Sequence, residues 1–341
     1  MSDAIFIVTG AVGHLGSHIV QELLSQGKQV RALVLPNESC PEFIDKNRYL
    51  LREYTGNVCD QTTLEPLFNA GPSEELVVIH CAGIVSISNK ADQRVYEVNV
   101  KGTKNIIEVC KRFSVKRLVY ISSVHAIPSL PHGQDMREVS SFDPDTVPGY
   151  YDKTKAIATQ MVLDAVKDGL DAVVVHPSGI IGPHGLPTGN MAQLITIHVR
   201  GRLPAAIHGG FDFVDVRDVA NGVIAAAEKG QSGECYILSN RFVDLREMFD
   251  ILSKVSARKR LRLYFPLWIV KAVTPFTELY YRLSHKTPIF TRYSLRTLSE
   301  NGHFSHDKAS RDLNYHTRSL QETLFDTAQW IKESVSQGST D

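Results

Sequence analysis

The sequence predicts a doubly wound α/β fold, in which helices cover both faces of a parallel sheet. Three observations lead to this prediction. Short apolar runs alternate with segments of helical periodicity through the first half of the chain. The first run, 4–9, is apolar on both faces, as expected of a strand buried in a parallel sheet. Glycines follow this run at once, where a strand would turn into a helix.

Length and composition are compatible with such a fold. The chain has 341 residues, 43% of them hydrophobic, which is enough to bury a large core. It carries 37 basic and 37 acidic residues, so its formal net charge is zero. A chain without charge excess lacks the electrostatic footprint of a nucleic-acid-binding protein. We therefore expect a small-molecule partner and no nucleic acid.

The cysteines and the N-terminus bear on metals and location. The five cysteines are scattered, with no C-x-x-C pair and no His/Cys cluster at metal-ligand spacing, so no metal site is predicted. We interpret them as buried or inert thiols in a reducing compartment. The first apolar run follows Met1-Ser2-Asp3 directly, lacks a basic n-region and is too short for a signal peptide. A cytoplasmic protein is expected.

The predicted elements follow one another in strand–helix order. Apolar residues at helical spacing (Leu15, Ile19, Leu23) predict a helix over 14–26, and Gly27 ends it before a strand at 29–35. Strands separated by helices indicate a parallel sheet with crossover connections. The further predicted strands are 50–55, 76–80, 117–122 and 172–176, and the further predicted helices are 62–69, 93–113 and 151–166.

A glycine-rich turn joins the first predicted strand to the first predicted helix. It reads T-G-A-V-G-H-L-G at 9–16 and places Gly10, Gly13 and Gly16 three residues apart. Glycines here permit a tight turn and let backbone amides at the helix N-terminus approach a pyrophosphate. A purely structural turn is the alternative, but the position on the first strand–helix turn favours a dinucleotide.

A tyrosine and a lysine lie one turn apart in the helix predicted at 151–166. The i, i+4 spacing puts Tyr151 and Lys155 on one face. An ammonium about 4 Å from a phenol, at an effective dielectric near 20, contributes on the order of 4 kcal/mol. That would lower the phenol pKa by up to roughly three units before desolvation opposes the shift. The alternative is a pair that merely shares a solvated helix face.

A serine supports the functional interpretation of this pair. Ser122 and Ser123 end the predicted strand at 117–122, and the carboxyl ends of parallel strands surround the ligand crevice. A serine hydroxyl at this position can hold a substrate carbonyl or alcohol oxygen in line with the phenol. The sequence thus predicts hydride-transfer chemistry on such an oxygen.

These motifs resemble those of the extended short-chain dehydrogenases/reductases, within the NAD-dependent epimerase/dehydratase superfamily, over nearly the whole chain. Seven motifs in the family's order are much more specific than any one of them. Besides the glycine turn, they are H-C-A-G at 80–83, N-V-K-G-T at 99–103, I-S-S at 121–123, Y-D-K-T-K at 151–155, H-P-S-G-I-I-G-P at 176–183 and F-V-D-V-R-D-V-A at 213–220. The resemblance implies a Rossmann-type sheet with a smaller mixed C-terminal region.

The resemblance also implies a role for each matching residue. Tyr151 would be the general acid/base, Ser123 would orient the reacting oxygen, and Lys155 would bind the nicotinamide ribose and lower the tyrosine pKa. Asn99 would support the proton relay, while Tyr151 and Lys155 would also contact the cofactor. The other implied cofactor contacts are Gly10, Gly13, His14, Leu15, Gly16, Asn57, Val58, Cys81, Ala82, Gly83, Pro177 and Ile180.

Two departures from the family pattern concern the adenosine half of the cofactor. Asn57 replaces the usual Asp, although its amide oxygen can still accept a hydrogen bond from an adenine amino group. Val34 stands where NAD-preferring relatives often have Asp, and Leu35 where NADP-preferring ones often have Arg. We expect NAD rather than NADP, since a 2′-phosphate normally binds a guanidinium. Recruitment of one of three nearby cations would reverse this expectation: Arg31, Lys46 or Arg48.

The regular alternation ends near residue 177, where loops rich in Gly and Pro begin. We assign 1–176 mainly to the dinucleotide-binding domain and 177–335 mainly to a substrate-binding region, with some segments returning to the first core. Residues 336–341 are a tail. No low-complexity linker separates the parts. The resemblance implies a homodimer through helices such as those at 93–113 and 151–166.

The active-site surroundings favour simple alcohol/carbonyl redox chemistry. S-V-H-A at 123–126 replaces the Ser-Ala-Thr or Thr-Asp-Glu found in sugar-nucleotide epimerases and dehydratases, and the chain looks more like the dihydroflavonol-reductase and 3β-hydroxysteroid-dehydrogenase branch. We therefore predict interconversion of a hydrophobic secondary alcohol and ketone, or reduction of an aldehyde or ketone. One alternative is a nucleotide-sugar epimerase or dehydratase that binds a diphosphate through Arg200, Arg202 and Arg241. Another is a non-catalytic dinucleotide-sensing protein.

Several further residues have more than one interpretation. His125 is either a second acid/base or a pocket-lining residue, and Asp215 and Asp218 are expected in a structural turn and a helix cap. The aromatic-rich stretch 264–283 is interrupted by charged residues and prolines, so it is not a bilayer span. It either covers the pocket or a dimer partner, or lies at a membrane interface. His176, His184 and His208 have no partner visible in the sequence.

Overall fold

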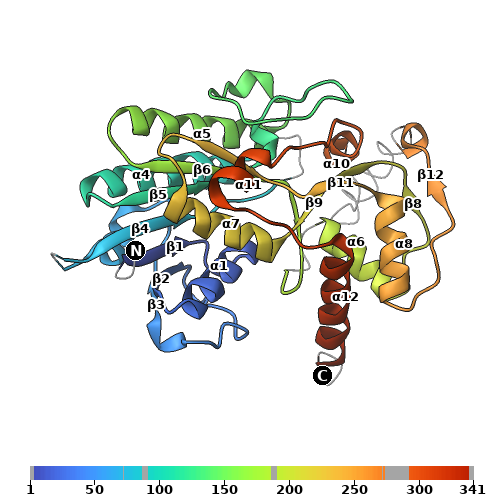
Figure 1. Ribbon diagram of the computed structural model, residues 1–341, viewed down its shortest axis with the longest axis horizontal. Coiled ribbons are helices and arrows are strands. Elements are labelled where there is room, and N and C mark those ends of the chain that lie inside the picture. The colour runs from blue at the N-terminus through green and yellow to red at the C-terminus, as the bar shows by residue number, and fades with distance from the viewer. Residues whose placement is uncertain are drawn as a thin grey trace.

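A seven-stranded sheet dominates the first part of the molecule, as the computed structural model shows (Figure 1). The structure describes residues 4–71, 73–86, 91–185, 190–270, 272 and 292–337. All neighbouring strands in this sheet are parallel, which confirms the predicted doubly wound class. In spatial order the strands are β10 (Cys235–Leu238), β6 (Ala172–Pro177), β5 (Arg117–Ile121), β4 (Glu75–His80), β1 (Ala4–Thr9), β2 (Gln29–Val34) and β3 (Leu51–Thr55).

Helices cover both faces of this sheet, which is why its central strands are apolar throughout. On one face, Phe6 and Val8 of β1 belong to the same apolar cluster as residues of α1 (His14–Ser25) and α7 (Val216–Lys229). On the other face, Ile5 and Ile7 join residues of α2 (Glu65–Phe68), α4 (Thr103–Arg112) and α5 (Tyr150–Lys167). Alternate residues of a strand point to opposite faces, so both sets are buried.

Two predicted helices are shorter or less regular than the periodicity suggested. The helix expected at 93–113 consists of α3 (Gln93–Tyr96), a π-helical segment (Glu97–Gly102) and α4. The helix expected at 62–69 is a 3₁₀ turn (Gln61–Thr63) followed by the single turn of α2, with Pro66 in its first turn. The π segment widens the helix around Asn99, and such segments often mark functional sites.

The second part of the chain contributes three small units. A three-stranded sheet has the order β11 (Arg241–Asp244), β9 (Gly210–Asp215) and β7 (Gly179–Ile181), and β8 (Ala206–Ile207) pairs with β12 (Tyr264–Phe265). Three helices pack against one another: α6 (Asn190–Val199), α8 (Leu245–Val255) and α12 (Leu320–Gln337). Their buried residues share one apolar cluster with α4 and α5, so the core is continuous across both parts.

Segments beyond residue 177 also complete the first sheet. β10 pairs with β6 in the register Cys235↔Val174, and α7 packs on α1. The remaining helices are α10 (Arg292–Thr297) and α11 (Asp307–Leu313), with 3₁₀ turns at Arg48–Leu50, Val124–Ala126 and Pro144–Thr146. Within the described residues, no helix is long and apolar enough to cross a membrane. Most of the stretch predicted at 264–283 lies outside the described residues, which include only 264–270 and 272 of it.

Candidate active site

The glycine turn between β1 and α1 is closely packed. Gly10 has a positive φ of 66°, and a Cβ there would lie 2.7 Å from the Ala82 amide nitrogen. A Cβ on Gly16 would lie well inside contact distance of the Gly10 carbonyl oxygen. Gly13 caps α1 without a side-chain bond, and the first turn holds no acidic residue. The free amides at this helix N-terminus therefore suit a pyrophosphate.

Two further residues of this turn face the protein. Nε2 of His14 lies 2.9 Å from the Pro183 carbonyl oxygen, which ties the turn to the loop after β7. Burial lowers the pKa of His14, so its ring is neutral at pH 7. Leu15 is half-buried and packs against the apolar cluster beneath β1. Both side chains support the turn in this structure.

The end of β4 is bonded to the end of β1. The Ala82 amide donates to the Thr9 hydroxyl at 3.2 Å, and that hydroxyl lies 2.7 Å from Nδ1 of His80. The Cys81 amide donates to the Thr9 carbonyl oxygen at 3.2 Å. Burial lowers the pKa of His80 to about 3 and raises that of Cys81 to about 12, so neither is charged at neutral pH. Cys81 is thus unsuited to nucleophilic chemistry.

Asn99 connects the loop after β4 to α5. It is 1% exposed; its Oδ1 accepts from the Ile84 amide at 2.8 Å, and its Nδ2 donates to the Ile84 carbonyl oxygen and the Thr154 hydroxyl. A Cβ on Gly83 would lie 3.4 Å from Oδ1 of Asn99 and 3.5 Å from Nζ of Lys155. Asn99 therefore sets how close this loop lies to Lys155.

Ser123 and Tyr151 meet at the carboxyl ends of the strands. The Ser123 hydroxyl accepts from the His125 amide at 3.2 Å and lies close enough to the Tyr151 hydroxyl to lower its pKa. Ser122 differs, because its hydroxyl lies 2.6 Å from that of Thr159 in the core. Burial raises the pKa of Tyr151 and outweighs the lowering effect of Ser123. The phenol is therefore protonated at neutral pH in this structure.

Lys155 is buried beneath the site, and it forms no ion pair with any described acidic side chain. Its ammonium donates to the Ile121 carbonyl oxygen at 2.7 Å and lies 5.0 Å from the centre of the Tyr120 ring. Burial lowers the pKa of Lys155 to about 8. The sequence predicted an ammonium close enough to lower the Tyr151 pKa, but the structure shows that pKa raised. Desolvation by burial is the largest cause of this rise, and the Lys155 ammonium bonds to the Ile121 carbonyl oxygen.

The sequence analysis missed a buried network around Asp152. This carboxylate is 2% exposed and accepts from the Gly149 amide at 2.9 Å, the Tyr293 hydroxyl at 2.6 Å and the Arg296 guanidinium at 2.9 Å. Gly149 must be glycine, because a Cβ there would collide with Asp152 and lie 2.7 Å from the Tyr293 ring. The first turn of α5 is thus fixed by α10, more than 140 residues away in the sequence.

The histidines near the site have structural surroundings. The ring of His125 stacks on Phe211 with a centroid distance of 5.5 Å and lies edge-on to Tyr151 at 6.3 Å. Burial lowers its pKa, which suits a neutral pocket-lining residue. Nδ1 of His176 lies 2.9 Å from the Ser123 carbonyl oxygen, and burial lowers the pKa of His176 to about 4. His184 stacks on Phe43 at 4.1 Å.

The ends of β6 and β7 lie beside this group. Pro177 is the last residue of β6 and pairs with Leu238, and Ile180 is half-buried in β7. Between them, the Ser178 hydroxyl donates to Asp212 at 2.5 Å, and burial raises the pKa of Asp212 to about 6.

Asp215 caps α7 through the Arg217 amide, as predicted. Asp218 accepts from the Arg318 backbone and side chain. His208 lies 5.8 Å from the Tyr264 ring.

The residues expected to hold the adenine lie at the surface after β3. Asn57 is exposed, and its Oδ1 already accepts from the Cys59 amide at 2.9 Å; a carbonyl oxygen has a second lone pair for an adenine amino group. Val58 is buried, and its carbonyl oxygen accepts from Asn105 at 2.8 Å. The Asn57 side chain is therefore accessible to an adenine at this position.

The three cations considered for a 2′-phosphate are not gathered at the end of β2. Arg31 is buried and donates to the carbonyl oxygens of Leu67 and Asn69, both at 2.7 Å. Arg48 pairs with Glu53 at 3.3 Å and donates to three carbonyl oxygens in 40–44. Lys46 lies on another surface, beside α1 and α7. Arg31 and Arg48 are committed to structural bonds.

Comparisons with known proteins agree with this geometry. Residues 6–239 match the NAD dependent epimerase/dehydratase family. The chain is 30% identical over 332 residues to sterol demethylase protein B of Methylococcus capsulatus, covering 96% of this chain and 98% of that protein. It is 28% identical over 336 residues to a putative dihydroflavonol 4-reductase of Synechocystis, covering 97% and 95%. The crystal structure of gox2253 superposes with a TM-score of 0.80 at 28% identity, covering 97% and 98%.

Proposed function

The chain belongs to the NAD dependent epimerase/dehydratase family as an oxidoreductase of the short-chain dehydrogenase/reductase type, and we propose that it interconverts a hydrophobic secondary alcohol and its ketone. In this proposal hydride moves to or from a nicotinamide and Tyr151 exchanges the proton. The membership confirms the resemblance inferred from the motifs. The proposal rests on one observation: the Ser123 hydroxyl lies near the Tyr151 hydroxyl at the strand ends and lowers its pKa, with Lys155 one helical turn further along α5.

The chain's own residues fit a nicotinamide dinucleotide. Gly10 and Gly16 leave no room for side chains, and the uncapped N-terminus of α1 offers amides to a pyrophosphate. Gly83 leaves the approach to Lys155 open, where a ribose hydroxyl could replace the Ile121 carbonyl oxygen as acceptor. When bound, the nicotinamide would supply or accept the hydride.

The proton chemistry falls to Tyr151. In the reduction direction, Ser123 would donate a hydrogen bond to the substrate carbonyl oxygen, and the phenol would then protonate that oxygen as negative charge develops on it. The raised pKa of Tyr151 keeps its proton in place before this step. Lys155, with a pKa of about 8, adds a positive charge that stabilises the phenolate left behind.

Aromatic side chains support a bulky, apolar substrate. His125 and Tyr293 lie next to Tyr151, and Phe211 stacks on His125. Phe211 also packs edge-on to Phe304 at 5.7 Å. Aromatic surroundings of this kind favour hydrophobic ligands. Two relatives carry the names of a sterol protein and a dihydroflavonol reductase, which agrees with this substrate class.

We propose NAD as the preferred cofactor. A 2′-phosphate would need a guanidinium or ammonium near Val34 and Leu35, and the arginines considered for it are bonded elsewhere. The ratio of kcat/KM for NADH to that for NADPH tests this preference. A ratio below one would contradict it.

A ketone screen tests the activity. Purified protein is incubated with sterol ketones, flavanonols and simpler hydrophobic ketones, with NADH or NADPH, and nicotinamide absorbance is followed. We expect turnover, and we expect Tyr151→Phe to lower kcat roughly 1,000-fold, because only the phenolic proton is removed. Tyr150→Phe is the matched control, since Tyr150 lies at the neighbouring position and should leave kcat unchanged. Full turnover by Tyr151→Phe would refute the mechanism.

A nucleotide-sugar epimerase is the alternative from the same family. The basic residues considered for a diphosphate do not converge: Arg241 is paired with Glu247, and Arg200 and Arg202 follow the end of α6. Epimerisation of UDP-sugars without net change of nicotinamide absorbance would overturn the redox proposal. A homodimer through α4 and α5 stays a prediction, testable by sedimentation.

A further inference from the structure

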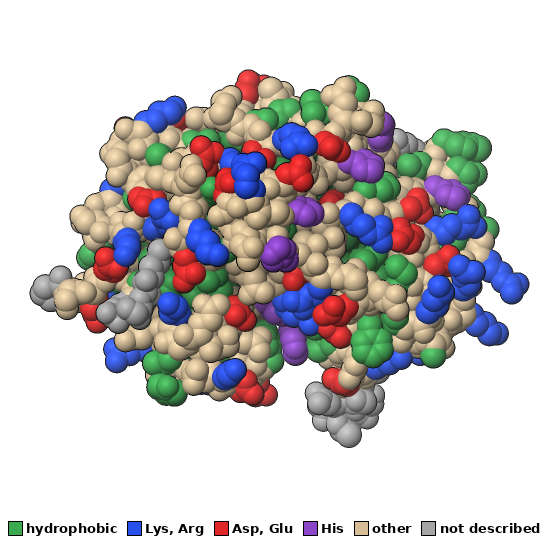
Figure 2. Space-filling model, in the orientation of Figure 1, with side chains coloured by type: hydrophobic (Ala, Val, Ile, Leu, Met, Phe, Trp, Pro, Cys, Tyr) green, Lys and Arg blue, Asp and Glu red, His purple; other side chains and the backbone are tan. Residues whose placement is uncertain are grey.

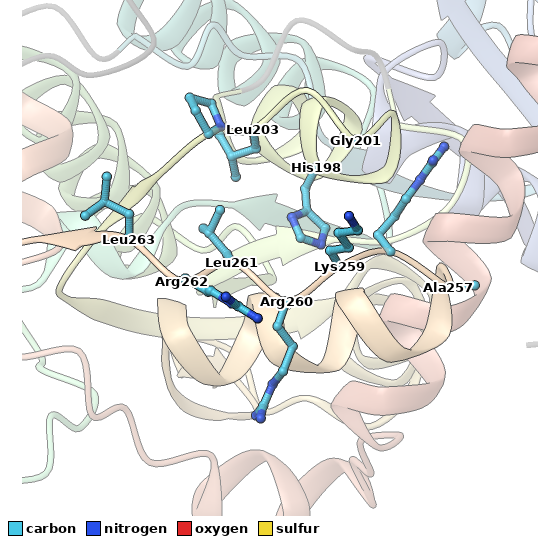
Figure 3. Close-up of a pocket in the computed structure, with 11 residues that line it drawn as sticks. His198, Gly201, Leu203, Ala257, Lys259, Arg260, Leu261, Arg262 and Leu263 are labelled. Atoms are coloured by element: carbon cyan, nitrogen blue, oxygen red, sulfur yellow. The ribbon is translucent and has the colours of Figure 1, made fainter.

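A groove of about 1070 Å³ opens at the end of the molecule that carries α8 and β12, beyond the seven-stranded sheet (Figure 3). Its walls are the end of α6 and the segment that links α8 to β12. That segment reads A-R-K-R-L-R-L at 257–263. The lining residues outside it are His198, Gly201, Leu203 and Pro204.

This groove carries an excess of positive charge. Residues 254–263 include five basic and no acidic residues, and two more arginines follow α6, whereas the whole chain has a formal net charge of zero. Arg260 is neutralised by Asp250, and Arg258 donates to the Val199 carbonyl oxygen. Within the described residues, no ion pair involves the other five cations: Lys259 and Arg262 line the groove, and Lys254, Arg200 and Arg202 lie near its ends in the sequence. We call four of them the basic groove: the lining residues Lys259 and Arg262 and the neighbouring Arg200 and Arg202.

Exposed apolar side chains lie directly beside the basic groove. Leu263 is 51% exposed, Phe265 39% and Trp268 71%. The described residues contain eight large hydrophobic side chains that are exposed, and three of the eight fall within these six positions. Figure 2 shows hydrophobic side chains next to a group of Lys and Arg side chains over α8 and β12. A cluster of this kind marks an interaction surface, because single exposed apolar residues are normally scattered.

The same surface is connected to the proposed active site. The Leu263 carbonyl oxygen accepts from the Ala206 amide at 3.1 Å, which pairs β12 with β8. The chain then runs from β8 into β9, where Phe211 stacks on His125 beside Tyr151. The strands β12, β8 and β9 therefore link the exposed apolar residues to the aromatic residues beside Tyr151.

We propose that the basic groove and the side chains of Leu263, Phe265 and Trp268 form a docking surface for an anionic phospholipid bilayer. The apolar side chains enter the boundary between headgroups and acyl chains, where tryptophan is favoured, and the four cations contact phosphates. Cations that form no ion pair complement a negatively charged leaflet. The proposal goes beyond the reaction and holds whichever ketone is reduced.

Vesicle co-sedimentation of the full chain tests the proposal. We expect binding to vesicles of phosphatidylcholine with phosphatidylglycerol, weakening with salt, and no binding to phosphatidylcholine alone. Lys259→Glu with Arg262→Glu should weaken vesicle binding roughly tenfold or more, because each of these cations is attracted to the negatively charged lipid surface.

Trp268→Ser should weaken vesicle binding several-fold, while the dependence of binding on salt is retained. The chain has two tryptophans, so Trp330→Phe isolates Trp268, whose fluorescence should shift to the blue on binding.

A matched variant controls for net charge. Arg52→Glu with Lys229→Glu makes the same charge change at exposed positions of the edge strand β3 and of α7. This double variant should bind vesicles like the unmodified chain. Thermal unfolding of both double variants should match that of the unmodified chain, which excludes misfolding. Absence of sedimentation with anionic vesicles, or equal loss in both double variants, would overturn the proposal. So would binding to polyglutamate but not to vesicles, which would indicate an acidic protein partner.

Discussion

The glycine turn and the first turn of α5 serve one proposed reaction but are built differently. The glycine turn is packed mainly through backbone: Gly10 and Gly16 lie against each other within seven residues, and the backbone of Cys81 and Ala82 lies against Gly10. The first turn of α5 is held by side chains from distant segments, chiefly Asp152 with Tyr293 and Arg296. A turn packed through its backbone can form from a local sequence pattern, whereas a site held by side chains from distant segments forms only once the chain has folded.

The two regions also differ in the charged groups that they can hold: the glycine turn suits a bound anion, whereas the surroundings of Tyr151 favour neutral side chains. The glycine turn offers polarised amides and no charged side chain, so an anion can replace water there. Around Tyr151, burial raises or lowers every resolved pKa toward the neutral form: Tyr151 and Tyr293 are raised, Lys155 and His125 lowered. The Asp152–Arg296 pair is the buried exception, and it is stabilised by three donors.

The largest expected effect comes from filling the glycine turn. Gly16→Ala places a Cβ against the Gly10 carbonyl oxygen and must displace backbone, so we expect a loss of roughly 3 kcal/mol in the free energy of unfolding and no measurable dinucleotide binding. Gly13→Ala is the control, since its Cβ would meet only the Gly10 oxygen at 3.2 Å. Denaturant titration and cofactor titration measure both. Equal tolerance of the two alanines would show that backbone packing does not define this turn.

A smaller effect is expected when Asp152 loses its cation. Arg296→Met leaves a buried carboxylate with two donors, which should lower the free energy of unfolding by about 2 kcal/mol. We also expect a lower kcat with unchanged cofactor KM, partly restored in Arg296→Lys, because Asp152 adjoins Tyr151. Arg260→Met removes an exposed Arg–Asp pair and should change neither quantity. If the two methionine variants behaved identically, Arg296 of α10 would have no role in positioning Asp152 beside Tyr151.

The smallest predicted effect is a gain in stability. Lys155 has its pKa lowered from 10.5 to about 8, so the folded state disfavours the ammonium at neutral pH. Lys155→Met should therefore raise the free energy of unfolding by about 1 kcal/mol at pH 7, after subtraction of the lost bond to Ile121. The gain is present below pH 8 and disappears as the pH rises toward 10.5, where the lysine is neutral in both states. A destabilised variant at pH 7 would show that the ammonium is well solvated.

Activity should respond to this variant in the opposite direction. Lys155→Met should weaken cofactor binding, because the proposed ribose contact is removed, even though the protein becomes more stable. Stored instability at a functional group is a common cost of activity. Isothermal titration with NADH measures the affinity, and unchanged affinity would assign Lys155 to the tyrosine alone.

The sequence by itself determined the sheet and the glycine turn. Apolar runs such as Ala4–Thr9 identify buried strands, and the glycine spacing predicts a turn with close backbone contacts, because both depend on neighbours in the chain. Strand ends, helical spacing and the family resemblance also predicted that Ser123 and Tyr151 lie at one site, and the structure places them close together; their catalytic roles stay a prediction. The strand β10 could not be recognised from the sequence, because its four residues are too short a pattern and are identified as a strand only by their pairing with β6.

Tertiary structure alone decided the electrostatics of the reactive group. Helical spacing put Tyr151 and Lys155 on one face, but it could not show that the Lys155 ammonium bonds to the Ile121 carbonyl oxygen or that burial raises the tyrosine pKa. Nor could it show that Asp152, in the middle of the motif, pairs with Arg296. Charges respond to the dielectric and to partners from all directions, and these exist only after the chain has folded.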